Sequence, residues 1–226
     1  MGLNLEKGEN KKLANGLSRF HIGLGWDVRE DSSPYDFDLD VSAFMIGADK
    51  KVLGDAYVVF YNSDNLLRVD ADGNLIKPLK IVDASAWTDN DKMRDESRPV
   101  DPELSVIGSL DDEDGSTSDD GDDETMDIDL SLVRPDVKEI VICVSIYHYA
   151  ERRQNFGQVE RAYVRLYRPG CERMGAEEYI YDLTEDFSAD HSVEFCRLYR
   201  HNGEWKIQAL GIGHKGGLEE LVAKFT

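Results

Sequence analysis

Short apolar runs separated by turn signals dominate this sequence, and most of them alternate with a period of two. Residues 19–26 alternate polar or small side chains with apolar ones, and residues 37–41 alternate strictly before the pattern continues through 44–46. Successive side chains of a β-strand point to opposite faces, so this pattern predicts half-buried strands. The runs 56–61 and 139–147 are almost continuously β-branched and aromatic, which is typical of central strands buried on both faces.

The second half of the chain continues in the same way, with strands expected at 161–168, 177–183, 192–200 and 204–211. Asn202-Gly203 between the last two predicts a hairpin with a type I′ turn, which requires positive φ. Only 217–225 has helical spacing, with its apolar side chains on one face. The sequence therefore predicts an all-β fold, a β-sandwich of two mainly antiparallel sheets with a short C-terminal helix.

The expected core consists of the inward-facing apolar side chains of these strands. They are Phe20, Ile22, Leu24, Phe37, Leu39, Val58, Phe60, Ile140, Ile142, Val144, Phe195, Leu198, Trp205 and Ile207. Residues 64–107 break the rhythm, because they are mixed in composition, contain three prolines and have only weak strand signals at 75–82. We therefore expect a single domain over 1–226, with a partly ordered insertion at about 64–107 and an acidic loop at about 108–125.

Charge is distributed unevenly along the 226 residues, which include 46 Asp and Glu against 26 Lys and Arg for a net charge of −20. Residues 111–129 carry eleven acids and no base, and residues 27–40 carry six acids and one arginine. Without these two windows the net charge would be −4. Such acidity argues against nucleic-acid binding and against docking on anionic lipid. No apolar run approaches the length of about 18 residues that spans a bilayer, so direct membrane insertion is not expected.

The two acidic windows have the chemistry of a hard-cation site. Asp36, Asp38 and Asp40 are two residues apart, so a strand would place their carboxylates on one face and its apolar residues on the other. Residues 119–124 place five acids around Gly121 and then pass into another alternating run. Oxygen ligands alone favour calcium over zinc or copper. The plain alternative is that 111–123 is a disordered acidic loop screened by solvent.

The cysteines, the histidines and the absence of known catalytic motifs argue against a disulfide-stabilised protein and against an enzyme. The three cysteines are odd in number, widely spaced and form no CxxC pair, which excludes a disulfide framework and favours the reducing cytoplasm. The five histidines show no paired metal-ligand spacing, and no P-loop, GxSxG or dinucleotide fingerprint is present. The sequence therefore does not predict an enzyme.

Several short sequence motifs, taken in their order along the chain, resemble those of a known protein family. They are Leu3–Gly8, Gly23–Asp27, Asp36–Phe44, Phe60–Asn62, Gly121–Glu124, Asn155–Val159, Tyr181–Asp186 and Tyr199–Lys206. In this order they resemble the TerD family of tellurite-resistance and stress-response proteins. The stretch 112–120 keeps the acids of the family's loop but not its glycines, and 64–107 has no recognised counterpart, so the chain resembles a divergent member with an insertion.

This resemblance implies a cytoplasmic, non-enzymatic, calcium-binding β-sandwich of the tellurite-resistance and chemical-stress response that binds two calcium ions. The implied metal ligands are Asp27, Asp36, Asp38, Asp122, Asp123 and Glu124, with Asp120 close by. It also implies that the protein acts through other stress-response and tellurite-resistance proteins, with a membrane protein as a further candidate partner.

Two other functions are compatible with the acidic clusters. A divalent-metal-dependent phosphohydrolase would use ions held between aspartates, although both windows lack the lysines that usually clamp phosphate, and the 27–40 window offers a single arginine. A calcium-dependent lipid-binding sandwich resembling a C2 domain would present apolar or basic loop tips, which 111–125 does not offer.

Overall fold

The computed structural model describes residues 3–4, 6–13, 17–28, 35, 37–68, 81–83, 97–110, 121–173, 175–176, 178–182 and 187–226. Its strands are β1 (Leu3–Asn4), β2 (Asn10–Lys12), β3 (Arg19–Val28), β4 (Leu39–Ile46), β5 (Val58–Val59), β6 (Asn65–Arg68), β7 (Ile81–Asp83), β8 (Ser97–Pro99), β9 (Val106–Gly108), β10 (Glu124–Asp129), β11 (Glu139–Ile146), β12 (Val159–Tyr167), β13 (Tyr179–Asp182), β14 (Ser192–His201) and β15 (Glu204–His214). The short helices are 3₁₀ turns at Asp55–Tyr57 and Phe156–Gln158 and the α-helices α2 (Tyr149–Arg152) and α3 (Leu218–Phe225).

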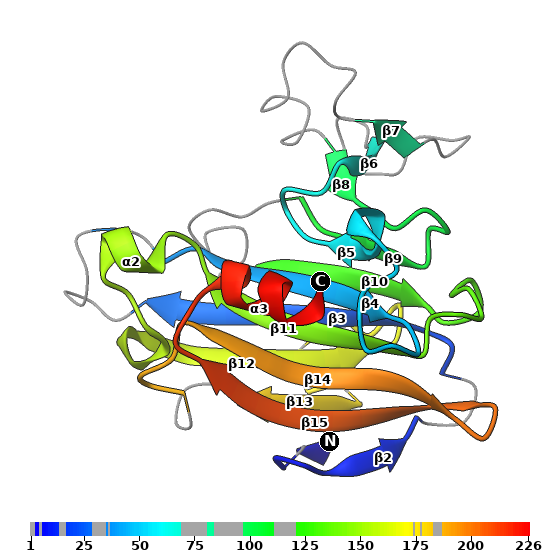
Figure 1. The fold of residues 1–226 in the computed structure, drawn as a ribbon. Helices are drawn as coiled ribbons and strands as arrows, with labels where there is room; N and C mark the ends of the chain where they lie inside the picture. Colours follow the sequence, from blue (N-terminus) through cyan, green and yellow to red (C-terminus); the bar gives the residue numbers. More distant parts are fainter. Residues whose placement is uncertain are drawn as a thin grey trace.

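Most of these strands form two packed sheets, as the alternating pattern predicts (Figure 1). The first sheet has the order β1-β13-β12-β3-β10-β9, and the second has the order β2-β15-β14-β11-β4-β5. Neighbouring strands pair antiparallel except β1 and β13, which pair parallel. The predicted all-β sandwich with a short C-terminal helix is therefore confirmed.

One large apolar core lies between the two sheets. Alternate side chains of β3 and β10 from the first sheet meet alternate side chains of β4, β11 and β14 from the second. Ile22, Leu24, Leu39 and Ile142 are fully buried there. This alternation leaves the other face of each strand outside this core.

A second apolar cluster lies on the outer face of the second sheet, where α3 covers it (Figure 1). Leu221 and Phe225 of α3 are buried against Phe44 of β4, with the Phe44 and Phe225 ring centroids 5.0 Å apart. The predicted amphipathic helix is thus confirmed, and its apolar face packs on the sheet. Val58 and Phe60 also belong to this cluster, so their predicted place in the core between the sheets was wrong.

The apolar run 56–61 does not form a central strand, and this prediction was wrong. Only Val58–Val59 has strand geometry, at the edge of the second sheet beside β4, and residues 55–57 form a 3₁₀ turn. Both side chains of this short strand are buried, because Val59 faces the core between the sheets and Val58 faces the α3 cluster. A continuous apolar run indicates that both faces of a strand are buried, but a two-residue strand at the edge of a sheet can be buried on both faces too.

The hairpin between β14 and β15 forms as predicted. Asn202 and Gly203 have φ values of 52° and 80°, which are the positive angles that a type I′ turn requires. Within residues 64–107, the described strands β7, β6 and β8 form a separate three-stranded sheet that projects from the sandwich (Figure 1). The sequence signal at 75–82 overlaps β7 only at Ile81 and Val82, and residues 69–80 lie outside the described residues.

Candidate functional site

The described acidic residues among the predicted metal ligands lie at one end of the sandwich. β3 ends there just after Trp26 and Asp27, β4 begins there after Asp38, and β10 begins there at Glu124. Antiparallel pairing of β10 with β3 sets Glu124 opposite Leu24, which brings the end of β3 beside the start of β10. We call this region the acidic end. Of the seven predicted ligands, Asp36 and Asp120 lie outside the described residues.

Asp123 and Glu124 accept hydrogen bonds from the backbone at the acidic end, and Glu124 joins the two sheets there. The Asp123 Oδ2 accepts a hydrogen bond from the Trp26 backbone N–H at 3.0 Å, within the first sheet. The Glu124 Oε2 accepts one from the Val41 backbone N–H at 2.6 Å, which joins β10 of the first sheet to β4 of the second. Both residues are buried, with 6% and 4% of their surface exposed. Their directions are therefore fixed by the backbones of both sheets.

Asp122 has an arginine partner that the sequence did not reveal. Its carboxylate oxygens lie 2.7 and 2.8 Å from the Nε and one Nη of Arg165 on β12, and both side chains are almost completely buried. The Tyr163 hydroxyl donates to the backbone carbonyl of Gly121 at 2.7 Å. Burial by itself would lower the pKa of Arg165, but the Asp122 carboxylate outweighs this effect and raises the pKa. The Asp122 charge is therefore already balanced inside the protein.

Two glycines of β3 make room for this ion pair. A Cβ atom on Gly23 would lie 2.1 Å from the Asp122 Oδ2, and a Cβ on Gly25 would lie 2.4 Å from the Tyr163 hydroxyl. Both distances are far below van der Waals contact. Gly23 and Gly25 therefore allow the side chains of Asp122 and Tyr163 to pack directly on the backbone of β3, on the outer face of the first sheet. Sequence reasoning missed Arg165. The available signal was a charged residue alternating with Tyr163 and Tyr167 on one strand face.

Asp27 and Asp38 have looser contacts with arginines. Arg161 pairs with Asp27, but its side chain is 76% exposed, so solvent and salt screen the pair. The nearest nitrogen of Arg152 lies 3.8 Å from Asp38 Oδ2, although the Asp38 side chain is only 7% exposed. The exposed pair of Asp27 is therefore weaker than the buried pair of Asp122.

The fit of a calcium ion can be judged from the donors that the acidic end offers. They are all carboxylate and backbone oxygens, which suit a hard cation. Within the described ranges, no three Asp, Glu, His or Cys side chains approach closely enough to hold a metal ion. A calcium site built on Asp38 and Asp123 would therefore need further acids from outside those ranges, such as Asp36 and Asp120.

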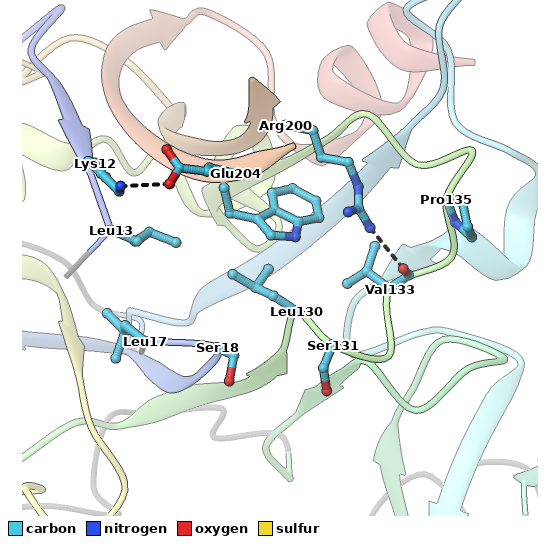
Figure 2. A pocket seen from close by; sticks show the side chains of 11 residues that line it. Lys12, Leu13, Leu17, Ser18, Leu130, Ser131, Val133, Pro135, Arg200 and Glu204 are labelled. Atoms are coloured by element: carbon cyan, nitrogen blue, oxygen red, sulfur yellow. Dashed lines mark hydrogen bonds and ion pairs between the residues drawn. The ribbon is translucent and has the colours of Figure 1, made fainter. Parts of the chain in front are cut away.

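A separate cavity of about 570 Å³ lies at the opposite end of β3, between the sheets (Figure 2). Its walls combine apolar side chains such as Leu130 with the Trp205 indole, and the Arg200 guanidinium lies 4.4 Å from the centre of that ring. Arg200 donates to the Val133 carbonyl at 2.9 Å, and Lys12 lies 2.6 Å from Glu204. The charged groups of this cavity are thus paired with one another or with backbone.

Sequence comparison identifies the family to which this fold and this acidic end belong. The family model described as TerD domain matches residues 1–71 and 87–225. The chain belongs to the TerD family. It is 36% identical over 228 residues to the Tellurium resistance protein TerD of an Alcaligenes species, covering 100% of this chain and 97% of that one. It is also 33% identical to General stress protein 16U of Bacillus subtilis, covering 100% and 97% of the two chains.

A solved structure supports the fold independently. A Streptomyces coelicolor homologue of the telluride resistance protein TerD superposes with a TM-score of 0.59 at 18% identity, over 92% of this chain and 96% of that one. The resemblance inferred from the sequence motifs is therefore confirmed. Between its two matched segments the family model leaves out residues 72–86, a shorter stretch than the 64–107 expected as an insertion. None of the helices in the described ranges is long and apolar enough to cross a membrane.

Proposed function

We propose that this TerD-family protein binds calcium at the acidic end and acts, without catalysis, in tellurium resistance and the stress response. Its relatives are named as tellurium resistance and general stress proteins. The observation that carries the calcium proposal is the placement of three acids at one end of the sandwich: Asp27 near the end of β3, Asp38 directly before β4 and Asp123 directly before β10.

The proposed ligand set is narrower than the set that the sequence suggested. Asp38 and Asp123 form its buried part, Asp27 adds a partly exposed carboxylate, and Asp36 and Asp120 are carried over from the sequence. Asp122 is left out, because Arg165 engages both of its oxygens. Glu124 fixes the start of β10 against Val41 of β4, and we assign it a positioning role beside the ions. Two ions remain the expected number.

Calcium would neutralise the excess negative charge of the acidic end and fix its carboxylates around the ions. We propose that stress-response and tellurite-resistance proteins, a membrane protein among them, recognise this calcium-bound surface. The three cysteines are free thiols, which agrees with a proposed cytoplasmic location.

Calorimetric titration with calcium tests the ligand set. We expect Asp38→Ala and Asp123→Ala each to abolish tight binding, because a preorganised ligand loses little conformational freedom when the ion binds. Neutralising Asp111, Asp112 and Asp114 together should weaken binding only modestly. Asp129→Asn is the matched control, since this carboxylate pairs with Arg19 at the opposite end of β3.

Equal losses in the two sets, or a larger loss from the 111–114 set, would move the site to the acidic loop. Wild-type affinity in both Asp38→Ala and Asp123→Ala would refute the proposed site altogether.

A further inference from the structure

A second cavity, of about 340 Å³, opens on the outer face of the second sheet. It lies between β4, β11, the residues of α2 and the beginning of α3. Asp40 and Ser145 form its buried floor, Tyr61 and Tyr147 contribute aromatic walls, and Glu151 and Glu219 stand at its exposed rim. We call it the tyrosine cavity.

The sheet register explains why two polar side chains lie at the floor. Asp40 of β4 pairs with Ser145 of β11, so the two residues are direct neighbours across the strands. Their sequence neighbours Val41 and Val144 face the core between the sheets, and alternation therefore turns Asp40 and Ser145 outward. Only 3% and 1% of their surfaces are exposed.

The Ser145 hydroxyl is buried and has no hydrogen-bond partner among the described residues. Burying a hydroxyl in this way is unfavourable unless a ligand or an ordered water completes it. The strand register places Ser145 next to Asp40 on the floor. A ligand that donates N–H groups there would complete the Ser145 hydroxyl and add a charged contact to the Asp40 carboxylate.

The charge and the aromatic rings of the tyrosine cavity select a cation. Asp40, Glu151 and Glu219 bring three carboxylates, and the one basic side chain among the described residues that line it is His148, which stacks on the Tyr147 ring with centroids 4.0 Å apart. The Arg152 guanidinium also lies over the Tyr147 ring, 5.5 Å from its centre. Aromatic faces beside carboxylates are a common way to hold an organic cation.

The spacing of the acids argues against a metal ion in this cavity. The three carboxylates are divided between the floor and the rim, and within the described ranges no group of three acids or histidines is close enough to bind a metal. A ligand with two positive ends and an apolar middle matches this division better than a point charge.

We propose that the tyrosine cavity binds a small aliphatic diamine or a related polyamine. One ammonium group donates to Asp40 and Ser145 at the floor, the methylene chain packs along Tyr61, and the second ammonium group reaches the rim carboxylates. The tyrosine cavity adjoins the proposed calcium site, because Asp40 is two residues from Asp38 and Arg152 lies near both Asp38 and the Tyr147 ring, but diamine binding does not require calcium.

Calorimetric titration of the full chain with 1,4-diaminobutane tests this proposal, both with a chelator and at saturating calcium. We expect binding under both conditions, weakened about tenfold by Ser145→Ala and more strongly by Asp40→Asn. Ser42→Ala is the matched control, because Ser42 is also a buried hydroxyl without a partner on the same face of β4 and lies outside the cavity lining. It should bind as the wild type does.

Tetramethylammonium, which has a positive charge but no N–H donor, should bind at least tenfold more weakly than the diamine. Wild-type affinity in Ser145→Ala would overturn the proposal, because it would mean that the diamine only screens the negative surface. Loss of diamine binding at saturating calcium would also overturn it, by placing the diamine at the acidic end. If Asp40→Asn does not fold, the exposed rim variant Glu151→Gln takes its place and should weaken binding severalfold.

Discussion

The ion pair between Asp122 and Arg165 should be a major contributor to the stability of the sandwich. Replacing Arg165 by Met keeps the length of the side chain but removes the charge that faces both Asp122 oxygens. The carboxylate would then remain buried without its counter-charge, since the Asp122 side chain is only 3% exposed. Breaking one partner of a buried pair costs about 3–5 kcal/mol of unfolding free energy. At about 2–4 °C for each kcal/mol in a domain of this size, the melting temperature should fall by roughly 6–20 °C.

Urea unfolding followed by circular dichroism at pH 7 would measure this loss, with and without calcium. Arg161→Met is the matched control, because its pair with Asp27 is largely exposed and should contribute about 1 kcal/mol or less. The double variant Asp122→Asn with Arg165→Met should regain much of the stability, since it removes both buried charges.

Two results would refute this reasoning. A loss below about 1 kcal/mol in Arg165→Met would mean that the buried pair contributes no more than a surface pair. A loss that disappears at saturating calcium would mean that the ion replaces Arg165 as the partner of Asp122, and Asp122 would return to the ligand set.

Three further predictions concern calcium, the cysteines and pH. Calcium at a hundredfold excess over its Kd should stabilise the folded chain by about 2.7 kcal/mol, and a melting temperature that does not change between chelator and excess calcium would contradict a folded-state site. Replacing all three cysteines by serine should leave tellurite resistance intact, because burial raises the pKa of the Cys143 and Cys196 thiols and keeps them protonated; lost resistance in a folded, calcium-bound variant would contradict this. Burial alone would raise the pKa of Asp127, but its contacts with His21 and Arg98 outweigh burial and lower the pKa. Its stabilising contribution is therefore present above an unfolded pKa of about 4 and lost as the pH falls, so Asp127→Asn should flatten the acid side of a stability–pH curve, and an unchanged slope would count against the pair.

Local patterns in the sequence determined much of the architecture, because they act within a few residues. Alternation in 19–26 and 37–46 fixes which face of β3 and β4 meets the core, and the structure confirms both strands. The Asn202-Gly203 turn and the apolar face of 217–225 depend only on backbone preference and helical spacing. The short sequence motifs, in their order along the chain, also indicated the family without any knowledge of three-dimensional contacts.

The tertiary structure decided everything that depends on partners distant in sequence. The run 56–61 has the composition of a central strand, yet its position at the edge follows from which strand pairs with β4. Asp122 looked like a ligand because its neighbours are acids, whereas the register of β3 and β12 brings Arg165 onto it across 43 positions. The tyrosine cavity likewise exists only because β4 and β11 pair Asp40 with Ser145. Alternation specifies the face of a strand on which a side chain lies, but strand order and register determine which side chain it meets there.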